Sequence, residues 1–146
     1  QSDALAHQFA AAMRRDRFGQ WAVEVPGEAP FVGFCGLAVA GFAAPFTPCV
    51  EIGWRLARAA WGHGYATEAA RAVMAHAFGP MRLEALVAFT AVGNLRSRRV
   101  MERLGMQRSP ADDFAHPDLP DGHRLRPHVL YRLSRERWAA MAGVGS

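Results

Sequence analysis

The sequence predicts a single mixed α/β domain, built on a mostly antiparallel β-sheet with one central pair of parallel strands. Apolar residues alternate with other residues over 50–56, which is the period of a strand. They then recur at helical spacing over 66–78, until Gly79-Pro80 ends the pattern. The segment 83–92 alternates again. Because a helix joins these two strands, we expect them to run parallel as a βαβ unit.

The segments before this unit are typical of one helix and a series of antiparallel strands. Two alternating segments flank Pro26-Gly27-Glu28, a composition that favours a hairpin turn. In the second of them, Gly33 and Gly36 are candidate sites of a bulge or of a close backbone approach. In order, the expected elements are a helix over 2–15, strands over 17–25 and 31–39, and a loop over 41–48.

The segments after this unit complete the expected sheet. Asn94 is a good N-cap for a further helix, with Ser97 in its first turn and Gly105 at the C′ position. Val129 and Tyr131 share one face of the closing strand. The expected elements are a helix over 94–104, a strand that starts at 106–108, an inserted polar loop over 110–127, a closing strand over 128–133 and a helix over 134–141.

The turn between the central strand and its helix has the features of an anion site. The first turn of a helix has unpaired N–H groups and a partial charge of about +0.5. Gly62 and Gly64 let a phosphate approach that backbone without meeting a Cβ, and His63 and Arg58 add positive charge nearby. A tight connection that only needs small residues is the alternative. Neither the three-glycine dinucleotide fingerprint nor the Gly-Lys-Ser/Thr end of a nucleotide-triphosphate loop is present.

Composition narrows the class of protein. With 146 residues and 51% apolar content, the chain is long enough for one globular core, and no apolar run is long enough for a membrane span. No signal-peptide pattern is present, and Cys35 and Cys49 lie in strand-like surroundings that favour reduced thiols, so we expect a cytoplasmic protein. All 17 basic residues are Arg and the net charge is +4. Their interleaving with Asp and Glu argues against nucleic-acid binding.

Four motifs together resemble the GNAT superfamily of acyl-CoA-dependent N-acetyltransferases, most closely the branch that acetylates ribosomal-protein N-termini. They are Glu51-Ile52-Gly53-Trp54, the run from Gly62 to Ala69, Asn94-Leu95-Arg96-Ser97, and the run from Met101 to Met106. The resemblance covers residues 17–134. It implies a parallel strand pair that splays apart at the CoA site, with helices on both faces of the sheet. It also implies that residues 1–146 form one such domain without the family's first strand and helix.

The resemblance implies a set of residues that bind acetyl-CoA. The diphosphate would lie on the amides of the glycine turn, and the pantetheine arm would run along the central strand, whose unpaired backbone groups its amides can satisfy. The family usually has Arg or Gln where Trp61 stands. The implied set is Trp54, Arg55, Leu56, Trp61, Gly62, His63, Gly64, Tyr65, Ala66, Thr67, Asn94 and Ser97.

Catalytic roles are implied in the same way. Glu51 would be the general base, and a strand glutamate paired to an arginine is the alternative. The N–H of Trp54 would polarise the acetyl oxygen. Many relatives use a tyrosine acid where this chain has Met101, which cannot donate a proton. Ser97 could instead hydrogen-bond the departing sulfur, with Tyr131 as a second candidate.

The polar loop over 110–127 does not predict a metal site. Its spacing of His116, His123 and His128 matches no standard zinc pattern, so we expect no metal. We expect the loop to shape the acceptor site or to contact a second copy in a homodimer, and its polar composition argues against a role in the core.

The sequence leaves three candidate functions. The first is an acetyl-CoA-dependent N-acetyltransferase that moves the acetyl group to a primary amine by direct attack in a ternary complex. The acceptor is open among a peptide N-terminus, a polyamine, a drug amine and a small metabolite. The second is a catalytically silent acyl-CoA-binding module, suggested by Met101. The third is an Arg-rich RNA-associated protein, which would show salt-dependent binding.

Overall fold

The computed structural model describes residues 19–25, 29–58, 61–62 and 64–143, with side chains from residue 33 onward. The helix predicted over 2–15 and the turn predicted over 26–28 lie outside the described residues. The chain divides into two compact units, each taken by itself below. Unit 1 comprises Gln1–Ala38 and Ile52–Leu83, and unit 2 comprises Val39–Glu51 and Glu84–Ser146.

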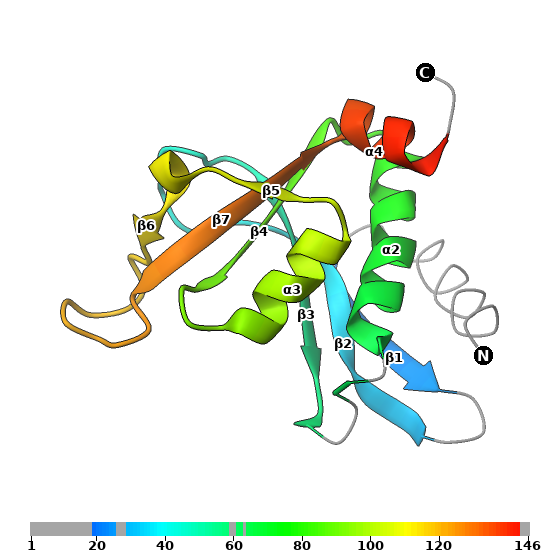
Figure 1. Ribbon diagram of the computed structural model, residues 1–146, viewed down its shortest axis with the longest axis horizontal. Helices are drawn as coiled ribbons and strands as arrows, with labels where there is room; N and C mark the ends of the chain where they lie inside the picture. The colour runs from blue at the N-terminus through cyan, green and yellow to red at the C-terminus, as the bar shows by residue number, and fades with distance from the viewer. Residues whose placement is uncertain (1–18, 26–28, 59–60, 63, 144–146) are drawn as a thin grey trace. The chain divides into compact units, whose positions relative to one another are not determined.

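The described residues of unit 1 contain part of the sheet and helix α2. Strands β1 (Gly19–Val25) and β2 (Ala29–Val39) pair antiparallel, with Val25 opposite Ala29, so the predicted hairpin is confirmed. The next strand in the order is β3 (Val50–Leu56), as predicted (Figure 1). At Gly33 a Cβ would overlap the carbonyl oxygen of Arg55 on β3, which confirms a close backbone approach at that glycine.

Helix α2 (Tyr65–Phe78) follows the glycine turn and ends where the sequence predicts. Gly64 is its N-cap with a left-handed φ of 77°, a conformation that favours glycine. At the other end, the N–H of Gly79 donates to the carbonyl of Ala75 at 2.9 Å. One face of α2 is buried, with at most 2% exposure at Ala69, Ala70, Val73, Met74, Ala77 and Phe78. The apolar residues that recur at helical spacing in the sequence therefore form the buried face of α2.

Unit 2 contains most of the sheet. Its strand order is β3-β4-β7-β5, and β6 also pairs with β7. Glu51 on β3 pairs in parallel with Val87 on β4, and the other pairs in this unit are antiparallel, so the predicted mixed, mostly antiparallel α/β sheet is confirmed. The elements are β4 (Ala85–Ala91), α3 (Leu95–Arg103), β5 (Gln107–Arg108), the 3-10 helix η2 (Pro110–Asp112), β6 (Phe114–Ala115), β7 (Pro127–Ser134) and α4 (Arg135–Ala142).

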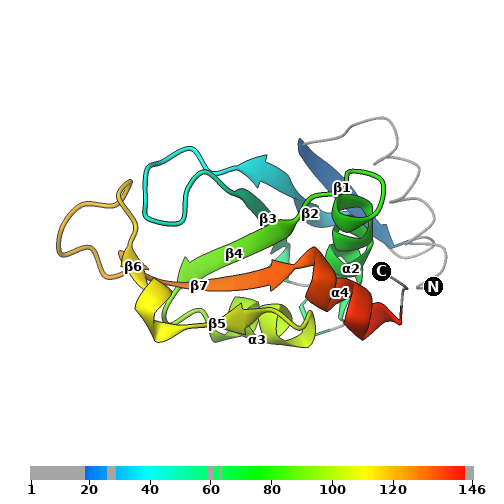
Figure 2. The same cartoon turned by 90° about the horizontal axis from the view of Figure 1, so that it is seen from above.

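The register of β4 and β7 decides which side chains share a face. Val87 lies opposite Arg132, Phe89 opposite Leu130, and Ala91 opposite His128. Paired residues project to the same side, so these side chains share the side of Glu51, here called the Glu51 face. The residues between them, including Tyr131, project to the other side. Figure 2 shows α3 on one side of the β4–β7 pair and the loop of residues 40–49 on the other.

The expectation that 110–127 is only a polar loop is wrong. The segment contains η2 and β6, and Asp112 bonds the guanidinium of Arg132 on β7 with Nε–Oδ2 at 3.0 Å. Phe114 packs against other aromatic rings. A two-residue strand is too short to show an alternating pattern, and its pairing with β7 depends on register rather than on local sequence. No helix among the described residues is long and apolar enough to cross a membrane.

Candidate acetyl-CoA and amine site

The glycine turn in unit 1 leaves open space above its backbone. Gly62 and Gly64 have φ values of 85° and 77°, and a Cβ added at either would meet no atom of the described residues within 4 Å. No side chain caps the start of α2, whose first N–H groups have no acceptor within the helix. The two glycines are therefore required by the backbone conformation, and the space above them suits an anion. His63 lies outside the described residues.

Thr67, in the first turn of α2, has a buried hydroxyl without a partner. The residue is 7% exposed, and its Oγ1 makes no hydrogen bond with any described part of the chain. Glu68 Oε1 is buried and unbonded in the same way. Leaving such an oxygen unsatisfied costs about 1–3 kcal/mol, so a buried hydroxyl at a helix N-terminus favours a bound partner there. The open turn and this hydroxyl together fit the diphosphate of CoA.

Trp61 hydrogen-bonds the last residue of the central strand, β3. Its indole Nε1–H donates to the carbonyl of Leu56 at 3.1 Å, and the guanidinium of Arg58 lies 5.7 Å from the centre of its ring. The carbonyl of Leu56 is one of the groups expected to bind pantetheine. This carbonyl already accepts one hydrogen bond within the protein. The roles of Trp54, Arg55 and Leu56 in binding pantetheine stay predictions.

Glu51, in unit 2, has the features of a general base. Burial raises its pKa from 4.5 to about 7. The ion pairs Arg108–Asp113, Arg126–Asp121 and Arg132–Asp112 do not involve Glu51, so they give no support to the alternative of a strand glutamate paired to an arginine. Burial also raises the pKa of the Cys49 thiol, and the charge of Glu51 raises it further. Glu51 is thus a half-buried carboxyl poised to exchange a proton near neutral pH.

Helix α3 begins as predicted. Asn94 is its N-cap: Oδ1 accepts the N–H of Ser97 at 3.3 Å, and Nδ2 donates to Thr90 Oγ1 at 3.1 Å. Ser97 is half-buried, so its hydroxyl is within reach of a ligand. Met101 is only 2% exposed, which makes it a packing residue of α3. The roles of Asn94 and Ser97 in binding CoA stay predictions.

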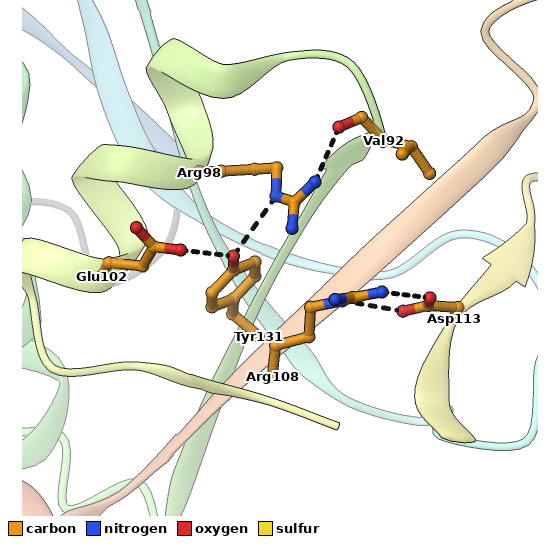
Figure 3. Close-up of polar contacts among 6 residues, drawn as sticks. All are labelled: Val92, Arg98, Glu102, Arg108, Asp113 and Tyr131. Carbon is orange, nitrogen blue, oxygen red and sulfur yellow. Dashed lines mark hydrogen bonds and ion pairs between the residues drawn. The ribbon is translucent and has the colours of Figure 1, made fainter. Parts of the chain in front are cut away.

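The hydroxyl of Tyr131 is hydrogen-bonded to other side chains of the protein (Figure 3). Its hydroxyl donates to Glu102 Oε2 at 3.0 Å and accepts from Arg98 Nε at 3.3 Å. Arg98 also donates through Nη1 to the carbonyl of Val92 at 2.8 Å, which fastens the start of α3 to the end of β4. Tyr131 projects toward α3, away from the Glu51 face, so it is a poor acid for chemistry at Glu51. Arg98 and Glu102 are not among the residues predicted from the sequence, although their spacing of four on a helix is a usable signal.

A group of aromatic rings in unit 2 was also missed. We call it the ring cluster; it consists of Phe42, Phe46, Phe89, Phe114, His116 and His128. The members are up to 86 positions apart in the chain, and no local pattern links them. Within the described parts of the chain, no group of three or more His, Cys, Asp or Glu residues could hold a metal ion.

Comparison with known proteins identifies the family. The model of the acetyltransferase (GNAT) domain matches residues 1–107. The N(2)-transacetylase of Aspergillus fumigatus, whose name specifies FsC and acetyl coenzyme A, is 34% identical over 128 residues, which are 85% of this chain and 53% of that protein. An uncharacterized N-acetyltransferase of Bacillus subtilis, YnaD, is 33% identical over 88 residues, which are 60% of this chain and 50% of that protein.

A solved structure agrees with this. The acetyltransferase (GNAT family) from Bacillus anthracis is 29% identical with a TM-score of 0.64, and the match covers 80% of this chain and 66% of that one. The chain spans about half the length of the two curated relatives. The strand, glycine turn and helix of unit 1, together with the family model over most of the chain, show that this chain belongs to the GNAT acetyltransferase family.

Proposed function

We propose that the protein is an acetyl-CoA-dependent N-acetyltransferase that acts on a primary amine by direct attack in a ternary complex. Membership of the GNAT family supports the reaction class. The observation that carries the proposal is Glu51, a half-buried carboxyl with a pKa raised to about 7 and no ion-pair partner among the described residues. A base with a pKa near the working pH is well suited to take a proton from an amine.

Each part of the reaction has a candidate group. Acetyl-CoA supplies the activated acetyl group, and the start of α2 with the Thr67 hydroxyl would hold its diphosphate. Glu51 accepts the proton that the amine loses as its nitrogen bonds to the acetyl carbon, directly or through one water. The family resemblance assigns Trp54 N–H to the acetyl oxygen. Ser97 is the candidate that would hydrogen-bond the departing sulfur, because Met101 has no proton to give.

The acceptor is the less defined substrate. The motif at 62–69 resembles the branch that acetylates ribosomal-protein N-termini, which makes a peptide N-terminus one acceptor class. The name of the Aspergillus fumigatus relative specifies FsC, acetyl coenzyme A and transfer at N(2). An acceptor nitrogen is what these have in common, and a primary amine is the acceptor class that we propose.

A silent acyl-CoA-binding module is the second candidate, and two observations favour it. Met101 is buried where relatives place an acid, and the Tyr131 hydroxyl is bonded to Glu102. The two candidates differ in turnover, which a panel of primary amines with acetyl-CoA and detection of the released thiol would measure. Turnover that is lost in Glu51→Gln supports the enzyme. CoA binding that is lost in Gly64→Asp, without turnover of any amine by the unaltered protein, supports the binding module.

A further inference from the structure

The ring cluster brings four segments of unit 2 together. Phe42 and Phe46 come from the loop before β3, Phe89 from β4, Phe114 and His116 from β6 and the residues after it, and His128 from β7. The closest ring centres are 4.6 Å apart for Phe42 and His116, 4.9 Å for Phe46 and Phe114, and 5.0 Å for His116 and His128. Several pairs meet edge to face, which is the arrangement that aromatic rings prefer.

All six rings are partly exposed. Each is half-buried, whereas Leu86 on β4 and Leu130 on β7 are fully buried with at most 1% of their surface exposed. Rings that only completed the core would be covered to the same extent as these leucines. Half-buried rings gathered in one place instead leave aromatic surface that another molecule can contact.

The ring cluster shares the face of the proposed base. Glu51 pairs with Val87, and Phe89 follows Val87 by two residues on β4, which is roughly 7 Å along the strand. His128 lies opposite Ala91, two residues further along, and Phe114 lies opposite His128. If a molecule places its amine at Glu51 and its long axis along β4, a short alkyl linker is therefore long enough for its other end to reach the rings.

The two histidines give the ring cluster one hydrogen-bond donor and one acceptor. The backbone N–H of Asp118 donates to Nδ1 of His116 at 3.1 Å, so the proton of the neutral ring lies on Nε2. His128 faces a carbonyl at its own Nδ1, that of Arg126 at 3.1 Å, and therefore carries its proton there and keeps a lone pair on Nε2. Burial lowers the pKa of His128, and the nearby His116 lowers it further.

The charges around the ring cluster do not favour a polyamine. Aromatic rings bind cations, but a cationic chain also needs acidic partners along its length. Between β5 and β7, Asp112 bonds Arg132, Asp113 bonds Arg108 and Asp121 bonds Arg126. The remaining carboxylate of this segment, that of Asp118, belongs to an exposed residue. Neutral aromatic surface with one imidazole donor and one imidazole acceptor suits an aromatic ring instead.

We propose that the ring cluster binds the distal part of the acceptor, and that the acceptor is a primary amine carrying an aromatic ring on a short alkyl linker. The inference rests on the proposed function, because it takes Glu51 as the group that receives the amine proton. A free arylalkylamine and a peptide that begins with an aromatic residue share this chemistry.

The test compares acceptors on the full chain with acetyl-CoA, by released thiol. The acceptors are phenethylamine, a linear alkylamine of similar length, spermidine and a short peptide beginning with Phe. We expect kcat/KM for an aromatic acceptor to exceed that for the alkylamine about tenfold or more. Phe89→Leu and Phe114→Leu should each reduce this preference about 3- to 10-fold, the worth of one aromatic pair. Phe78→Leu, in the buried core of unit 1, is the matched control and should leave the preference unchanged.

A binding measurement separates this inference from the proposed function. Saturation transfer from the protein to the ring protons of phenethylamine should be clear in the unaltered protein and weak in Phe114→Leu. If saturation transfer differs in this way between the two proteins while no amine is acetylated, the aromatic site is supported and the proposed function fails. Acetylation of all amines with equal kcat/KM, or a preference for spermidine, would overturn the aromatic site and leave the function standing. The absence of both binding and turnover would overturn the aromatic site as well. A preference for the peptide over phenethylamine, or the reverse, identifies the source of the ring.

Discussion

Replacing Glu51 by Gln keeps the shape of the side chain and removes its titration. If Glu51 is the base, kcat/KM near pH 7 should fall about 10²- to 10⁴-fold, while the affinity for CoA is unchanged. The unaltered protein should show activity that rises with pH through about 7, where Glu51 loses its proton. The activity of Glu51→Gln should not show this rise with pH. At high pH the loss should be smaller, because more of the amine is already neutral.

The same substitution has a consequence for stability that can be worked from the structure. Burial raises the pKa of Glu51 from 4.5 to about 7, so between these values the folded state holds a proton that the unfolded state has released. The contribution of this group to stability is therefore full below pH 4.5 and is lost as the pH rises through 7. The rise corresponds to at most about 3 kcal/mol, and to less where solvent screens the half-buried carboxyl.

Denaturant unfolding at pH 5 and pH 8 measures this difference. The free energy of unfolding of Glu51→Gln, relative to that of the unaltered protein, should increase from pH 5 to pH 8 by about 1–3 kcal/mol. Glu84→Gln removes an exposed glutamate of the same unit and is the matched control, with no such trend. Parallel stability curves would show that Glu51 is not desolvated, and turnover independent of the substitution at every pH would show that it is not the base.

Three further results are expected. CoA at about 100 times its dissociation constant should stabilise the fold by roughly 2.7 kcal/mol in thermal unfolding, and pantetheine should do so much less; no shift with CoA would contradict the diphosphate site. Gly64→Asp should weaken CoA binding by several kcal/mol in calorimetry through repulsion, whereas Gly122→Asp, at a similar φ of 82° away from the turn, should not; equal loss in both would assign the effect to backbone strain. Replacing residues 111–126 by a short Gly-Ser linker should lower the melting temperature, because the replacement removes the contacts of Asp112 and Phe114 with β7 and the ring cluster. An unchanged melting temperature would show that this segment is a simple loop.

The sequence by itself determined the features that depend on neighbours in the chain. The strand at 50–56, the left-handed Gly64, the cap at Asn94 and the end of α2 before Gly79 all follow from short-range periodicity or from backbone conformations that only certain residues adopt easily. The prediction of a parallel strand pair also succeeded, because a connecting helix leaves little choice of direction.

Only the tertiary structure decided the features that depend on long-range register. The pairing of β4 with β7 sets Glu51, Phe89 and His128 on one face and Tyr131 on the other, and a shift by one residue would exchange them. The raised pKa of Glu51 comes from burial, which no strand pattern states. Phe42 and Phe114 lie 72 positions apart, yet their rings stack with centres at 6.0 Å. Such contacts arise when separate segments fold onto one sheet, so local sequence patterns predict the glycine turn before α2 but not the ring cluster.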